Sequence, residues 1–66
     1  MFATRIKYLR QSAGINQVQL AEKLGVSKQS ISNWENDNIM PSIDMLVKIA
    51  DFFAVTTDYL LGRSIQ

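Results

Sequence analysis

The chain has 66 residues, a formal net charge of +1 and 47% hydrophobic residues. This length predicts a single domain, residues 1–66, with a modest core. The absence of Cys and His excludes a disulfide framework, a thiolate metal site and the commonest acid–base catalyst. No apolar run approaches the ~20 residues that span a bilayer, and the N-terminal residues do not resemble a signal peptide, so we expect a soluble cytoplasmic protein.

The charges are distributed unevenly along the chain. Up to Asn36 there are five basic and two acidic residues, whereas from Asp37 onward there are two basic and four acidic ones. A basic face on a small domain can bind phosphate. The same asymmetry is common on ordinary solvated surfaces, so charge alone leaves the function open.

Apolar residues recur at the helical period, and no useful stretch alternates as a strand would. The first expected helix carries an apolar stripe formed by Phe2, Ile6, Leu9 and Ala13. Gly14 suits the left-handed position that follows a helix. A second helix is expected at about 17–24, because Asn16 can cap it through its side-chain oxygen. Its inward-facing residues are Leu20, Ala21 and Leu24.

Three more helices are expected in the rest of the chain. Gly25 ends the second helix, and Ser27 caps a third at about 28–36. After a loop that contains Pro41, Ser42 caps a fourth helix, whose inward-facing residues are Ile43, Leu46, Ile49, Ala50 and Phe53. A cap at Thr56 or Thr57 starts a short fifth helix that Gly62 closes. These elements predict an all-α fold of five short helices.

The link between the second and third helices is too short for a long antiparallel hairpin. The two helices must therefore cross at a steep angle. Ala21 permits a close approach, and Gly25 permits a turn with positive φ. The angle between the helices is filled by Leu20, Leu24, Val26, Ile31 and Trp34. The sequence thus predicts a helix-turn-helix at about 17–36.

The third helix has two different faces when its residues are placed at ~100° intervals. One face is apolar and anchored by Trp34. The other carries Lys28, Gln29, Ser32, Asn33 and Asn36. Amides can pair bidentately with adenine, Lys can donate to guanine, and Ser can bond to several base edges. Small polar residues can also be plain surface, but together with the steep helix pair they favour DNA binding.

The stretch "NQVQLAEKLGVSKQSISNWEN" resembles the helix-turn-helix of the phage-repressor (Cro/CI-like) family of bacterial regulators. The flanking stretches "RIKYLRQSAGINQ" and "PSIDMLVKIADFFAVTTDYLLG" resemble its first helix and its fourth and fifth helices. The resemblance covers nearly the whole chain and implies a compact five-helix, lambda-repressor-like domain. It further implies a transcriptional regulator of the repressor kind. Such a regulator would bind a palindromic double-stranded DNA operator as a homodimer, with the third helix in the major groove.

The resemblance also implies roles for individual residues. The expected DNA-binding residues are Gln17, Lys28, Gln29, Ser32, Asn33, Asn36 and Asn38. Gln17 matches a phosphate contact at the start of the second helix, and Asn36 and Asn38 match positions near the DNA backbone. Arg10 and Glu35 match an ion pair between the first and third helices; direct contact of Arg10 with DNA is the alternative. Asp37 departs from the family, which often has Gly there followed by a basic residue.

The dimer surface is expected in the C-terminal part, with the candidates Met45, Phe52, Thr57 and Leu60. Met45 and Phe52 could instead be ordinary, partly exposed apolar residues. No catalytic residue, metal, cofactor or small-molecule effector is expected, because five short helices leave little room for a pocket.

Three other functions compete with DNA binding. An antitoxin-like interaction module is left open by the low net charge and by Asp37, although the basic N-terminal half argues against it. An enzyme would need His, Cys or convergent carboxylates. An RNA-binding protein would need an aromatic stacking platform on the polar face.

Overall fold

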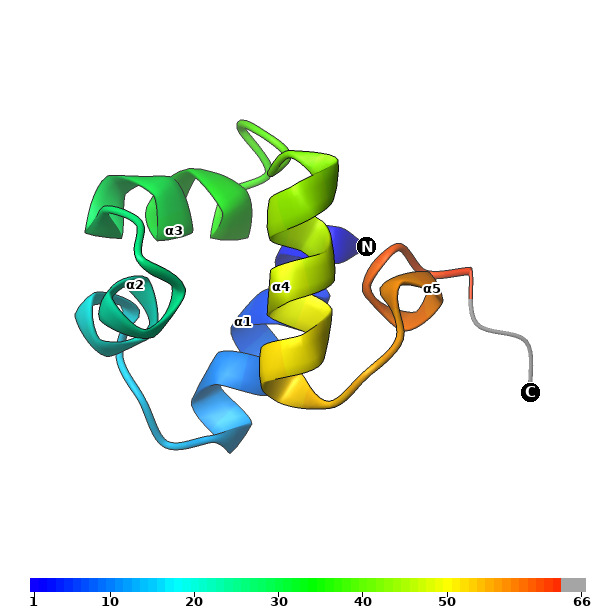
Figure 1. The fold of residues 1–66 in the computed structure, drawn as a ribbon. Coiled ribbons are helices and arrows are strands. Elements are labelled where there is room, and N and C mark those ends of the chain that lie inside the picture. Colours follow the sequence, from blue (N-terminus) through cyan, green and yellow to red (C-terminus); the bar gives the residue numbers. More distant parts are fainter. Residues whose placement is uncertain (64–66) are drawn as a thin grey trace.

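All five expected helices are present in the computed structural model, which describes residues 1–63. They are α1 (Phe2–Ser12), α2 (Gln17–Leu24), α3 (Lys28–Glu35), α4 (Ile43–Phe53) and α5 (Thr57–Leu60). Residues 1–63 contain no strand, so the predicted all-α class is confirmed. In the same range no helix is long and apolar enough to cross a membrane. Figure 1 shows α4 standing between the α2–α3 pair on one side and α5 on the other.

Four of the helices begin at a side-chain cap, as the sequence predicts. In each, the cap oxygen accepts the backbone N–H three residues later, at 2.8–3.1 Å; the caps are Asn16, Ser27, Ser42 and Thr56. Thr56 rather than Thr57 is therefore the cap of α5. At α2 the Gln19 side chain also accepts the Asn16 N–H at 2.8 Å, which completes a capping box.

The helices end alike, with a residue in the left-handed region just beyond the last turn. Three of these residues are the glycines at positions 14, 25 and 62, with φ of 72°, 73° and 74°. The other two are Asp37 after α3 and Ala54 after α4, with φ of 61° and 56°. At both, the next residue donates its N–H across the turn, from Asn38 to Asn33 O and from Val55 to Ala50 O, each at 2.9 Å. This is the Schellman arrangement, which satisfies the last carbonyl groups of a helix.

The core lies where the helices converge. Its fully buried large side chains come from all five helices: Ile6, Leu20, Leu24, Ile31, Ile49 and Leu60. Trp34 is 6% exposed and joins the same cluster, so it anchors α3 as predicted. α3 packs against both α1 and α2, whereas α5 packs against α1 and α4. The Arg5 guanidinium lies 4.5 Å from the centre of the Tyr59 ring, which adds a cation–π contact between α1 and α5.

Two residues predicted to face inward do not. Ile43 is 80% exposed, because it is the first residue of α4 and shares a flank with the exposed Val47 one turn later. Ala13 is exposed, because α1 ends at Ser12 and the chain then turns at Gly14.

Candidate nucleic-acid interface

The turn between α2 and α3 is held from two sides. Gly25 adopts φ of 73°, and the Val26 N–H donates back to Ala21 O at 3.0 Å. The Lys48 ammonium group of α4 donates to Leu24 O at 2.9 Å, at the carboxyl end of α2. A cation is favourable there because the helix dipole places partial negative charge at that end. The sequence gives no sign of this role of Lys48, because no local pattern signals a contact between residues 24 positions apart.

The outer face of α3 carries the polar residues predicted for it. Lys28, Gln29 and Asn36 are exposed, and Ser32 and Asn33 are half-buried. Ile31 on the opposite side is fully buried. The structure therefore brings the five predicted side chains together on one helix, supported from behind by the core.

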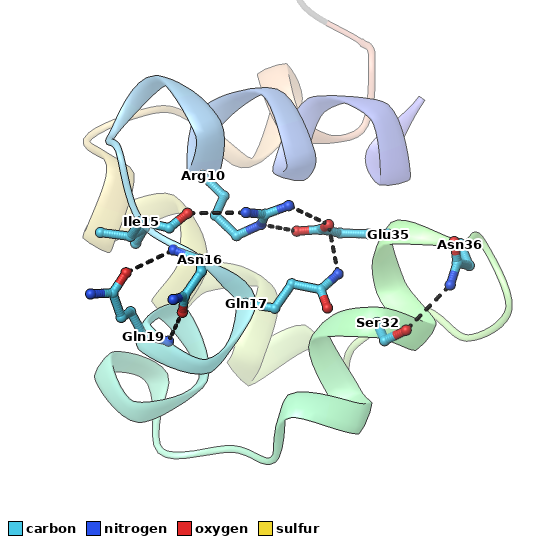
Figure 2. Close-up of polar contacts among 8 residues, drawn as sticks. All are labelled: Arg10, Ile15, Asn16, Gln17, Gln19, Ser32, Glu35 and Asn36. Atoms are coloured by element: carbon cyan, nitrogen blue, oxygen red, sulfur yellow. Dashed lines mark hydrogen bonds and ion pairs between the residues drawn. The ribbon is translucent and has the colours of Figure 1, made fainter.

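These side chains are hydrogen-bonded to one another along the helix. Gln29 Nε2 donates to Asn33 Oδ1 at 3.1 Å. Asn36 Nδ2 donates to Ser32 Oγ at 3.3 Å, the contact drawn at the end of α3 in Figure 2. Both pairs are four residues apart, the spacing at which side chains on a helix meet. The two hydrogen bonds thus link four of the five polar side chains in pairs along the face.

One carboxylate joins α3 to α1. Arg10 Nε and Nη2 donate to the two oxygens of Glu35 at 2.7 Å and 3.0 Å. The two side chains are only 11% and 3% exposed. The hydrogen bond to Glu35 raises the pKa of Arg10. Burial lowers this pKa by a smaller amount, and the negative charge of Glu35 raises it further. Arg10 Nη1 also donates to Ile15 O at 3.0 Å. The predicted ion pair is present, and its internal bonds support a structural role for Arg10 rather than DNA contact.

The same carboxylate also holds Gln17. Gln17 Nε2 donates to Glu35 Oε1 at 3.1 Å, so Figure 2 shows residues of α1, α2 and α3 meeting at Glu35. The Gln17 side-chain amide therefore uses one of its donors within the protein. Its backbone N–H lies in the first turn of α2, where N–H groups have no partner within the helix and form an anion-binding end.

The loop after α3 differs from the rest of the face. Asp37 and Asn38 are both exposed, and the backbone of Asn38 closes the turn. Ile39 and Met40 follow with 57% and 48% exposure, which sequence analysis did not anticipate. The loop thus places a carboxylate and two apolar side chains beside the end of α3.

The prediction that Leu60 lies on the dimer surface is wrong. Leu60 is 0% exposed, because α5 packs against the core through this side chain. Met45 and Thr57 are half-buried, and Phe52 is 40% exposed and in edge-to-face contact with Phe53. The predicted patch therefore loses Leu60 and keeps Phe52 as its most accessible member.

A groove of about 420 Å³ opens beside α1 and α5. It is lined by Met1, Thr4, Arg5, Tyr8 and Tyr59, none of which belongs to the predicted DNA-binding set. The expected absence of a small-molecule effector accordingly stays a prediction.

Comparison with known proteins agrees with this geometry. Residues 6–60 match the helix-turn-helix family. The HTH-type transcriptional regulator ImmR of Bacillus subtilis is 44% identical over 59 residues, which are 89% of this chain and 46% of ImmR. The HTH-type transcriptional activator BcrR of Enterococcus faecalis is 42% identical over 61 residues, 92% of this chain and 30% of BcrR. The chain spans about half or less of these curated relatives.

The fold is also similar to that of a solved repressor. The P22 c2 repressor, crystallised with a synthetic operator, superimposes with a TM-score of 0.90 at 30% identity over 97% of both chains. These proteins are named as regulators and a repressor, not as enzymes. The family match over residues 6–60, together with the α2–α3 geometry, establishes that the chain belongs to the helix-turn-helix family of phage-repressor type.

Proposed function

We propose that this domain binds double-stranded DNA sequence-specifically, with α3 in the major groove, and acts as a transcriptional regulator. The observation that carries the proposal is the outer face of α3, where one cation and four uncharged polar side chains stand opposite the Trp34 anchor. The similarity to an operator-bound repressor over 97% of both chains supports it. Helix-turn-helix proteins dock their second helix in this way.

In this arrangement phosphate contacts fix the position and base contacts fix the sequence. The first turn of α2 supplies the backbone N–H groups of Gln17 and Val18 to a phosphate. Gln17 thus keeps its predicted role near the backbone, although Glu35 engages its side chain. The base-reading residues are Lys28, Gln29, Ser32 and Asn33, and Asn36 and Asn38 lie toward the DNA backbone.

Truncating two amides tests the base-reading claim. In Gln29→Ala plus Asn33→Ala, discrimination between the selected operator and random DNA should be lost, because each good bidentate contact contributes about 1–3 kcal/mol. The operator is obtained by selection from random duplexes, and binding is measured by fluorescence anisotropy. Gln11→Ala, which truncates an exposed amide on α1, is the control. Circular dichroism checks that both variants fold, and unchanged discrimination in the double variant would contradict the proposal.

We further propose that two copies bind a palindromic site, because one recognition helix reads only a few base pairs. Half-sites ~34 Å apart would place both α3 helices on one side of the duplex. The interface assigned to the second copy is the surface around Phe52, with Met45 and Thr57 at its edge.

A pair of charge substitutions locates that interface. Phe52→Glu should lower the mass in sedimentation equilibrium and weaken operator binding, because a carboxylate would be desolvated between the copies. Ile43→Glu is the matched variant, since Ile43 is exposed on the opposite flank of the same helix. Loss of the dimer in Ile43→Glu but not in Phe52→Glu would move the interface to the amino end of α4.

We expect the regulator to repress. The operator complex that this chain matches with a TM-score of 0.90 is that of a repressor. A DNA-bound domain of this kind can repress by occupying the operator. A reporter gene placed behind the selected operator measures the sign directly, and increased expression would overturn repression while leaving DNA binding intact.

A further inference from the structure

The exposed side of α4 carries a patch that neither the DNA-binding set nor the surface around Phe52 uses. With Ile43 at zero and ~100° per residue, Val47 falls at about 40°, Asp51 at about 80° and Asp44 at about 100°. These four residues, which share one face of α4, form the acidic flank. Its apolar members are 80% and 46% exposed, and both carboxylates are exposed. In the described chain neither carboxylate forms an ion pair, because the ammonium group of the neighbouring Lys48 is turned to the end of α2.

The groove beside α1 and α5 has the opposite charge. Its apolar lining includes Met1 and Tyr8, which are 67% and 60% exposed. Of its lining residues one is charged, Arg5, whose guanidinium lies on the Tyr59 ring. No carboxylate in the part of the chain that the structure describes pairs with this guanidinium. α1 contains no acidic residue, and Lys7 adds an exposed cation to the same helix. The groove, which we call the α1–α5 groove, is therefore apolar and basic.

The acidic flank and the α1–α5 groove lie on the outer sides of two helices that share one core. Ile6 of α1 and Ile49 of α4 are both fully buried in that core. Tyr8 and Ile43 stand on the other sides of these helices, and Figure 1 shows α1 passing behind α4. The two patches therefore do not face each other within one copy, and each is open to another molecule. Exposed apolar side chains gathered beside charge of one sign are typical of such contact surfaces.

We propose that the acidic flank of one copy docks into the α1–α5 groove of a second copy. The apolar side chains of the flank cover the exposed lining of the groove, and Asp44 and Asp51 pair with Arg5. Two acidic flanks repel each other, and so do two basic grooves, so each patch selects the other rather than itself. The contact is heterologous and leaves one free patch at each end, so further copies can join in a row. It is separate from the proposed pairing through Phe52.

Charge reversals test this contact in chains that also carry Phe52→Glu, which removes the pairing through Phe52. Asp44→Lys plus Asp51→Lys reverses the flank, and Arg5→Glu reverses the groove. Each should self-associate at least about tenfold more weakly than Phe52→Glu alone, because like charges then face each other. An equimolar mixture of the two should recover the association, since an intact flank meets an intact groove and the two reversed patches also attract. Sedimentation equilibrium over a range of protein concentrations measures the mass.

Lys23→Glu is the matched control. It makes the same change of charge as Arg5→Glu, at an exposed position of α2 outside both patches. It should leave the self-association unchanged. Circular dichroism checks that each variant folds. If Arg5→Glu does not fold, Thr4→Glu places a carboxylate in the same groove and keeps the contact of Arg5 with Tyr59.

Three results would overturn the proposed docking. The first is a Phe52→Glu chain that stays monomeric at every concentration. The second is a reversed flank or groove that associates as strongly as Phe52→Glu alone, and the third is a mixture no heavier than its components. Because no DNA is present, each of these results leaves the proposed function standing, and a failure to bind DNA leaves this experiment valid.

Discussion

Asp37 occupies a backbone position that suits glycine. Its φ of 61° lies in the left-handed region, which is unfavourable for residues with a Cβ. Asp tolerates this conformation better than most residues, because its short polar side chain can bond locally. Ala54, with φ of 56°, has no such compensation. The chain therefore carries local strain at the ends of both α3 and α4.

Replacing each residue by glycine separates strain from charge. We expect Ala54→Gly to raise the free energy of unfolding by about 1 kcal/mol, and Asp37→Gly by less. Only Asp37→Gly should also tighten DNA binding, because it removes a carboxylate beside the proposed phosphate path. Urea denaturation and anisotropy titrations measure the two effects. Equal DNA affinity of the wild type and Asp37→Gly would show that this loop lies away from the phosphates.

The ion pair of Arg10 and Glu35 is also a residue-scale feature, and only 11% and 3% of the two side chains are exposed. We expect Arg10→Met to lower the free energy of unfolding by about 3–5 kcal/mol, since Glu35 would remain buried without its partner. Arg10→Met plus Glu35→Leu should recover most of that loss. Urea denaturation measures the free energy of unfolding of both variants. If Arg10→Met does not fold but the double variant does, the result also supports the cost of leaving Glu35 buried without a partner. A loss below about 1 kcal/mol in Arg10→Met would mean that the pair contributes little.

At the scale of elements, much of the fold could be predicted because its signals are local. The caps Asn16, Ser27 and Ser42 and the glycines after α1 and α2 stand within one turn of the helix ends they specify. The division of α3 into two faces needs only its own periodicity.

The features that the sequence did not predict correctly depend on packing between distant elements. The burial of Leu60 depends on how α5 meets α1 and α4, and the contact of Lys48 with Leu24 O joins two distant elements. The left-handed Asp37 was also missed, because Asp gives no glycine signal. The base-reading residues stay a prediction, because a free domain does not show which base edge each side chain meets.

At the scale of the whole molecule, the small net charge conceals an uneven distribution. Lys28 lies on the proposed DNA face, whereas Arg63 follows α5 in the sequence. Figure 1 shows α5 across α4 from the α2–α3 pair. DNA binding driven by phosphate contacts must weaken as salt rises, because bound cations are released from the duplex.

The salt dependence gives a prediction for the intact domain. A plot of log K against log salt should have a negative slope, and Lys28→Gln should reduce its magnitude, because it removes a cation from the proposed DNA face. Arg63→Gln is the control and should leave the slope unchanged. A slope near zero in the wild type would instead favour a protein-interaction module.

The Glu35 carboxylate, which holds donors from α1 and α2 at the end of α3, has a consequence for the kinetics of association. Because the orientation of the reading helix is set in the free protein, little backbone order remains to be gained when DNA arrives. Binding should then need little conformational change, and electrostatic attraction to DNA should set the association rate. Operator and random DNA should accordingly differ mainly in how long the complex lasts.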